Sequence, residues 1–255
     1  MEISVLIYPL IFMASFVLSM AGLGGGLIFA PMFILLGFGQ APAVASSLFL
    51  NALGASFASY NYIRSKMVDF SLSIPLIITS GLSAPVGAVA TKWVNENIFM
   101  TIMSVVILLA GLRMLFSDKL IPADISNKYY WSWGKLIQAS VMGIVIGFMG
   151  GMLGIGGGVF VVPLLVFILK INPKTAAASS AFIVCFSSLT GFLTHASVEN
   201  LDWKFLILAG LFASAGGLAG SRLMSTKLSN TFVKKLFGVI LLFLAAYLFF
   251  QAMWN

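Results

Sequence analysis

Charged residues are scarce in this chain. Only 8% of its 255 residues are Asp, Glu, Lys or Arg, while 60% are hydrophobic; a soluble domain usually carries about 25% charged residues. So few charges cannot coat a water-facing surface. Several uncharged stretches exceed the roughly 20 apolar residues that one bilayer-spanning helix needs, among the stretches 3–63, 136–169, 175–198 and 205–221. The sequence therefore predicts an all-α polytopic membrane protein.

Cysteine and histidine are nearly absent. The chain has one of each, Cys185 and His195, and seven acidic residues. A single Cys excludes a disulfide framework and a cysteine-based metal site, and one His with few acids leaves little for acid-base catalysis. The motifs HExxH and GxSG are missing, as are paired acids within the apolar stretches. We therefore expect neither an enzyme nor a bound metal or cofactor.

The strongest pattern that is present is an internal repeat. The motif Gly-Leu-Gly-Gly-Gly at 22–26, followed by Pro31, recurs as Gly-Ile-Gly-Gly-Gly at 154–158, followed by Pro163. Further along, Val-Asp-Phe at 68–70 matches Leu-Asp-Trp at 201–203. The chain therefore divides into two homologous halves, 1–117 and 134–255, joined by a polar linker, 118–133.

Each half contains five apolar segments, of which the second is short. At about 1.5 Å per residue it makes roughly 20 Å of helix, less than the roughly 30 Å hydrocarbon thickness. The second segments can therefore stop inside the membrane. The ten segments are 3–21, 25–38, 43–62, 71–91 and 97–116, then 135–153, 157–169, 174–196, 203–223 and 230–253.

The basic residues indicate the topology, because cytoplasmic loops are enriched in Lys and Arg. In one arrangement the first two segments of each half return to their starting side, and an N-terminus outside then places 12 of the 14 basic residues in the cytoplasm. In the other arrangement these two segments make one net crossing together, which places seven basic residues on each side. The first arrangement is favoured. It predicts inverted-topology repeats, with both termini outside and the linker cytoplasmic. The 12 are Arg64, Lys66, Arg113, Lys119, Lys128, Lys135, Lys170, Lys174, Arg222, Lys227, Lys234 and Lys235.

The two glycine motifs predict breaks in the helices, since each Gly costs about 1 kcal/mol relative to Ala in a helix interior. The N–H groups that open the following short helix lack intrahelical partners and carry roughly half a positive charge. They could therefore hold an anion; the alternative is tight helix packing. Pro31 and Pro163 lie either at the first position of these helices or one turn inside them. The candidate substrate-binding residues are Gly24, Gly25, Gly26, Gly156, Gly157 and Gly158.

The third segment of each half carries a polar stripe. Spacings of three and four residues place its members on one helical face, where hydroxyl and amide groups could complete the shell of an oxyanion. Packing between helices is an equally weighted alternative for any one of them. The substrate-binding candidates are Ser47 and Asn51 in the first half, in line with Gly54 and Ala58, and Ser180 and Ser187 in the second, in line with Val184 and Gly191.

Three further residues are singled out. His195, which aligns with Tyr62, is a candidate for substrate contact or proton coupling, although a structural hydrogen bond is favoured. Asp69 and Asp202 open the fourth segments and are expected to cap their helices.

The duplicated GxGGGxxxxP motif, the Ala-Ser-Ser at 45–47 and 178–180 and the Asp-aromatic pairs resemble the TauE/SafE family of sulfite exporter-like permeases. The likeness covers 9–116 and 140–250. It implies transport of sulfur-containing anions, such as sulfite or organosulfonates, across the bacterial inner membrane.

Residues and resemblance together predict a secondary transporter that exports small anions. An anion channel of the same architecture is the alternative. The expected partners are the anion and the lipid bilayer; scattered basic residues disfavour a nucleic-acid partner. The sequence leaves a homo-oligomer open.

Overall fold

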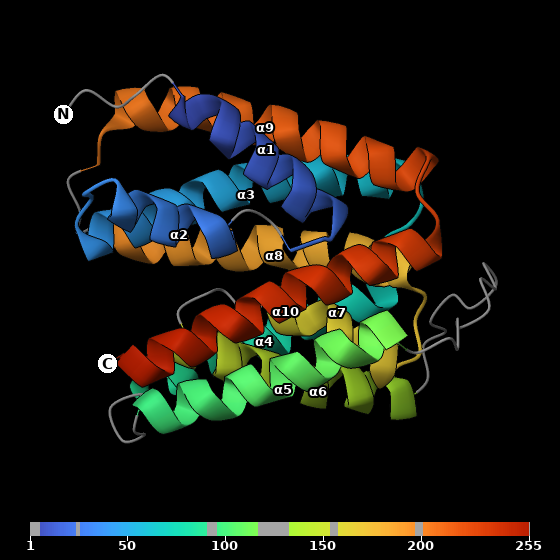
Figure 1. The fold of residues 1–255 in the computed structure, drawn as a ribbon. Coiled ribbons are helices and arrows are strands. Elements are labelled where there is room, and N and C mark those ends of the chain that lie inside the picture. Colours follow the sequence, from blue (N-terminus) through green and yellow to red (C-terminus); the bar gives the residue numbers. More distant parts are fainter. Residues whose placement is uncertain are drawn as a thin grey trace.

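The computed structural model describes residues 6–23, 26–90, 96–116, 133–153, 158–196 and 201–254. These residues form ten helices and no strand (Figure 1), which confirms the predicted all-α class. The helices are α1 (Ile7–Met20), α2 (Gly26–Leu35), α3 (Gln40–Arg64), α4 (Phe70–Ala90), α5 (Glu96–Phe116), α6 (Trp133–Leu153), α7 (Gly158–Phe167), α8 (Pro173–Ala196), α9 (Trp203–Thr226) and α10 (Asn230–Trp254).

Within the described residues, four helical stretches are long and apolar enough to cross a membrane: Pro42–Arg64, Pro173–Leu193, Trp203–Thr226 and Asn230–Phe250. Large apolar side chains also cover the outside of the bundle. Leu82 is 73% exposed, Leu211 63% and Phe243 77%. Exposed apolar side chains of this kind are unfavourable in water and fit lipid tails. The chain is therefore a polytopic membrane protein.

The second helix of each half is short, as predicted. Both α2 and α7 have ten residues, about 15 Å of helix. They begin at Gly26 and Gly158, so Pro31 and Pro163 lie inside them rather than at the first helical position. The glycine motifs separate them from α1, which ends at Met20, and from α6, which ends at Leu153.

The first two helices form a hairpin that returns to its starting end. Tyr8 lies near the start of α1 and Phe33 near the end of α2, and both rings pack on Phe205, with centroids 6.1 Å and 5.6 Å away. Phe205 stands at the start of α9. The end of α2 therefore lies beside the start of α1.

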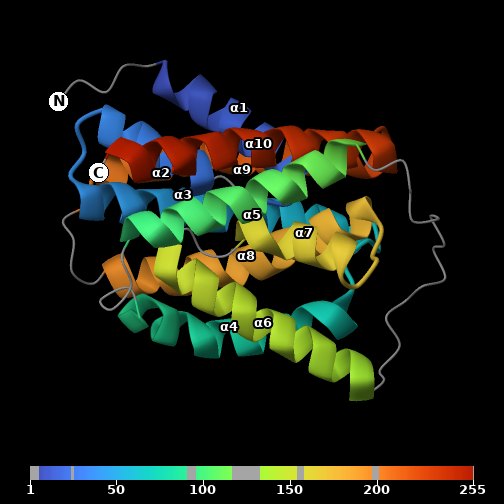
Figure 2. The ribbon, with the colours of Figure 1, turned by 60° about the horizontal axis from the view of Figure 1, so that its bottom comes forward.

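Equivalent helices of the two halves run antiparallel where they pack together. On α3 and α8, Asn51 lies opposite Ser188 and Ser56 lies opposite Cys185, so the numbers rise on one helix as they fall on the other. Helices α5 and α10 also lie side by side and run in opposite directions (Figures 1 and 2).

The two halves interlock. The first helix of each half packs along the fourth helix of the other, as α1 on α9 and α6 on α4. Small residues let the backbones approach closely. Gly147 lies against the carbonyl of Ser80, and Gly220 lies against that of Phe16. The repeats therefore stabilise each other rather than forming separate globular units. The linker 118–133 lies outside the described residues apart from Trp133, and the half boundaries stay a prediction.

Both predicted caps are present. The Asp202 carboxylate accepts a hydrogen bond from the Phe205 N–H at 3.1 Å, and the Asp69 carboxylate accepts one from the Leu72 N–H at 3.3 Å. Each satisfies an N–H group that has no intrahelical partner. The Asp69 N–H also donates to the Ser179 hydroxyl at 3.1 Å, which ties the start of α4 to α8.

The turns after α2 and α7 each contain a residue with positive φ, which is Gly in the first turn and Lys in the second. Gly37 follows α2 with φ +85°, and Lys170 follows α7 with φ +53°. A residue with a Cβ is strained in this left-handed region, whereas Gly is not. We expect Lys170→Gly to stabilise the protein by about 0.5–1 kcal/mol, measured by denaturation in mixed detergent micelles. Lys170→Ala, which removes the charge and keeps the strain, is the control; equal stabilisation by both variants would contradict the backbone explanation.

Candidate functional site

The first glycine break lies directly on α8. The Gly22 N–H donates to the Ser19 carbonyl at 3.1 Å, and the Leu23 N–H donates to the Leu18 carbonyl at 3.0 Å, which closes the end of α1. Gly22 has φ +70°, and a Cβ there would overlap the backbone carbonyl of Ala177. Only Gly satisfies both conditions. Of the predicted binding residues, Gly26 is the first residue of α2, while Gly24 and Gly25 lie outside the described residues.

The second glycine break reaches the same helix. Gly158, the first residue of α7, is buried, and a Cβ there would overlap the Val184 side chain on α8. The same position is 3.4 Å from the Leu23 carbonyl oxygen of the first break. Gly156 and Gly157 lie outside the described residues. The described ends of the two motifs thus lie against each other.

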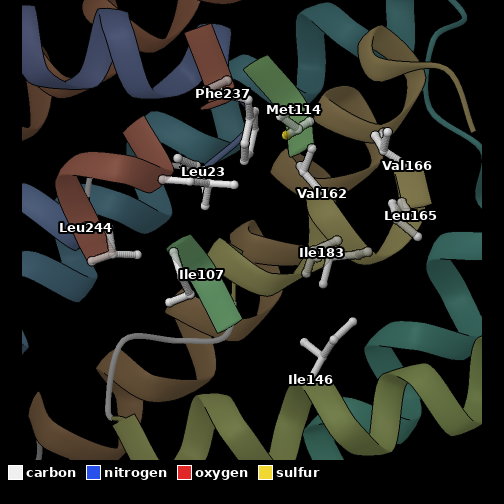
Figure 3. Packing of buried hydrophobic residues seen from close by; sticks show 14 of the residues in the cluster. Leu23, Ile107, Met114, Ile146, Val162, Leu165, Val166, Ile183, Phe237 and Leu244 are labelled. Atoms are coloured by element: carbon white, nitrogen blue, oxygen red, sulfur yellow. The ribbon is translucent and has the colours of Figure 1, made fainter. Parts of the chain in front are cut away.

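Leu23 joins the two halves through its side chain as well. It is 4% exposed and belongs to a buried apolar cluster with Val162 of α7 and Phe237 of α10. Figure 3 shows Leu23 beside Phe237 and facing Val162. The break in the first half is therefore packed on helices of the second half.

Ser180 lies on α8 between the contact points of the two breaks. It follows Ala177 by three residues and precedes Val184 by four, so the three share one helical face. Its side chain is fully buried, and its hydroxyl has no hydrogen-bond partner. An unsatisfied buried polar group costs about 1–3 kcal/mol and requires an explanation. A ligand held between the glycine breaks would supply the missing partner.

The stripe on α3 is buried throughout: Ser47 is 1% and Asn51 3% exposed, and Gly54 and Ala58 are buried as well. The Asn51 amide donates to the Ser188 hydroxyl on α8 at 2.7 Å, and its carbonyl oxygen has no partner. Asn51 therefore links equivalent helices of the two halves.

The stripe on α8 is only partly inward. Ser180 and Val184 are buried, but Ser187 is half-buried and donates to the Val184 carbonyl at 3.2 Å. Its neighbour Ser188 is fully buried and contacts Asn51. The sequence pattern missed Ser188, because positions seven and eight residues after Ser180 both fall within one broad helical stripe, and the sequence does not show which of the two faces inward. The two adjacent serines at 187 and 188 indicated that one of them could face α3.

His195 lies in α8, but its side chain is outside the described part of the chain, so its predicted role is untested. Among the residues whose placement is described, no group of three or more His, Cys, Asp or Glu side chains could hold a metal ion.

Short helices that each follow a glycine break, with both breaks touching one facing helix, are typical of membrane transporters with broken helices. The sulfite exporter TauE/SafE family model matches residues 7–248, nearly the whole chain. The chain belongs to the TauE/SafE family.

Three relatives align with this chain over most of their own length. The chain is 29% identical over 236 residues to the probable membrane transporter protein YunE of Bacillus subtilis, covering 82% of this chain and 85% of the relative. It is 28% identical over 220 residues to YfcA of Escherichia coli K12, covering 84% and 78%. A probable membrane transporter protein of Haemophilus influenzae is 26% identical over 246 residues, covering 95% and 93%. No solved structure matches the chain. This TauE/SafE protein is thus a membrane transporter.

Proposed function

We propose that this TauE/SafE protein is a secondary transporter that exports small sulfur-containing anions, such as sulfite or organosulfonates. The observation that carries the proposal is the meeting of the two glycine breaks on α8, around the unpartnered hydroxyl of Ser180. The description of the family model, a sulfite exporter, supports this substrate class.

Neutral donors would hold the anion. The N–H groups at the start of α7 have no intrahelical partners, and the helix dipole places roughly half a positive charge there. Gly158 removes the side chain that would cover them. The Ser180 hydroxyl adds one donor from the facing helix. Hydrogen bonds to a charged group are worth about 1.5–3 kcal/mol each. Two of these N–H groups together with the Ser180 hydroxyl would therefore give useful affinity without an anion-binding Arg.

Inverted repeats would give the site alternating access. The antiparallel packing of α3 against α8 and the returning hairpin of α1 and α2 support this arrangement. In such transporters the substrate is held near the bilayer midplane, where one repeat rocks against the other. The inner membrane, with both termini outside, is the location and orientation that we propose.

The membrane potential favours export of an anion. Moving one negative charge out of a cell that is negative inside releases about 2.3 kcal/mol per 100 mV, roughly a fifty-fold gradient. Export therefore needs no second driving ion.

Flux measurements in proteoliposomes test the proposal. We expect saturable movement of sulfite that follows an imposed potential, together with exchange of labelled internal sulfite against external sulfite. A carrier shows this countertransport, whereas a channel shows conductance without it. Absence of flux for sulfite and for methanesulfonate in folded protein would refute the proposed function.

The Ser180 hydroxyl gives a sharper test. Because the hydroxyl has no partner in the protein, Ser180→Ala should not lower stability, while it raises the KM for sulfite about tenfold or more, the cost of one hydrogen bond to an anion. Ser59→Ala is the matched control, since Ser59 is also buried with an unpartnered hydroxyl but lies on α3. Equal KM changes in both variants would count against a site at Ser180.

A further inference from the structure

Lys234 is buried, although the next residue, also a lysine, is exposed. Its side chain is 6% exposed, and it is the one charged residue among the buried side chains of the described chain. Lys235, the next residue of α10, is exposed. The topology assigned both residues to the cytoplasmic end as equivalent charges. The fold separates them, because consecutive residues of a helix point about 100° apart.

Lys234 faces the bundle at the end of an apolar stripe. Phe237, Leu241, Leu244 and Leu248 follow at spacings of three and four residues, and all are buried in one cluster. These spacings place the five side chains on one face of α10. The first residue on this face of α10 is therefore a cation, and the buried residues that follow it are apolar.

The same stripe packs on the first glycine break. Leu23 belongs to the buried cluster that contains Phe237 (Figure 3). Lys234 is three residues before Phe237, about 4.5 Å along the helix axis. Its other neighbour in the chain, Val233, is buried with Ala177, the residue that Gly22 contacts. Lys234 thus lies on the side of α10 that faces the break.

A buried cation is costly unless it has polar surroundings, and ionisable residues inside membrane bundles commonly mark substrate pathways. Lys234 interacts with the protein around it, and a long flexible stem lets its ammonium change partners. The donors described at the glycine breaks are neutral, so only the partial charge of the helix dipole compensates the charge of an anion that binds there.

We infer that Lys234 supplies the counter-charge for the transported anion, a small oxyanion with one negative charge, at the cytoplasmic side of the glycine breaks. This inference rests on the proposed function. A single ammonium matches a single charge; a dianion would keep one charge uncompensated in a low-dielectric site, and that cost is large. Lys234 is therefore a binding residue, and Lys235 is a topology marker.

Adjacent lysines provide a matched experiment. Flux of methanesulfonate, a monoanion, is measured in proteoliposomes for Lys234→Gln, Lys234→Arg and Lys235→Gln, and thermal stabilisation by methanesulfonate is measured on the purified proteins. We expect Lys234→Gln to raise the KM at least about tenfold and to lose the stabilisation. Lys235→Gln removes the same charge from the same end of α10, and its KM should stay within about twofold of the wild-type KM. Lys234→Arg keeps the charge and should keep most of the affinity.

The outcomes separate the two proposals. If the wild-type protein neither transports nor is stabilised by sulfite or methanesulfonate, the proposed function fails and this inference fails with it. If the wild type transports and Lys234→Gln behaves like Lys235→Gln, only the role of Lys234 is refuted. Should Lys234→Gln not fold, Lys234→Met replaces it, because Met has a similar length. If neither folds while Lys234→Arg does, the charge is structural and the inference is overturned.

Discussion

Gly158→Leu should abolish sulfite transport. Any side chain at this position meets Val184 on α8 and points toward the Leu23 carbonyl of the first glycine break. A Leu would therefore cover the N–H groups that open α7 and separate the two breaks. Loss of two hydrogen bonds to an anion costs about 3 kcal/mol or more, over 100-fold in affinity. Initial flux in proteoliposomes measures this effect.

Gly81→Leu is the matched control for this variant. Gly81 lies in α4 and is exposed, and a Cβ added there would have no atom within 4 Å, so the same substitution meets open space. Its flux should equal that of the wild type. Transport by a folded Gly158→Leu variant at the level of Gly81→Leu would show that the start of α7 does not bind the anion.

Gly22→Ala should strongly destabilise the protein. The residue has φ +70°, which costs an L-residue about 1–2 kcal/mol, and the new Cβ would overlap the Ala177 backbone, which cannot rotate away. Overpacking of this kind adds about 1–3 kcal/mol. We expect a loss of about 3 kcal/mol or more, measured by denaturation in mixed micelles.

Gly37→Ala separates the two causes. Gly37 has φ +85° but nothing within 4 Å of the added Cβ, so only the backbone term remains, about 1 kcal/mol. If both variants lost the same stability, the contact between Gly22 and α8 would contribute nothing.

The local sequence was sufficient to predict the helices. Apolar periodicity, Gly motifs and capping acids act within one or two helical turns, and the ten predicted segments agree with the ten helices to within a few residues. The caps at Asp69 and Asp202 were predicted for the same reason. The position of Pro31 was left open, because both a first-turn and an internal Pro fit the same motif; the helix start at Gly26 decides it.

The candidate site was predictable only in part. The glycine motifs and the buried serine at 180 were identified from the repeat. Ser188 and Lys234 were not, because each stands beside a residue of the same kind and a single sequence does not distinguish the inward neighbour. Burial against a partner helix makes that choice.

The amino-acid sequence alone determines that this chain is a helical membrane protein and where its helices break, since these properties depend on composition and short-range chemistry. Tertiary structure decides that α3 packs on α8, that Leu23 meets Gly158, and that Lys234 faces inward while Lys235 does not. These contacts join residues more than a hundred positions apart or depend on a small rotation of a helix, and both are set by packing between helices rather than by any local pattern.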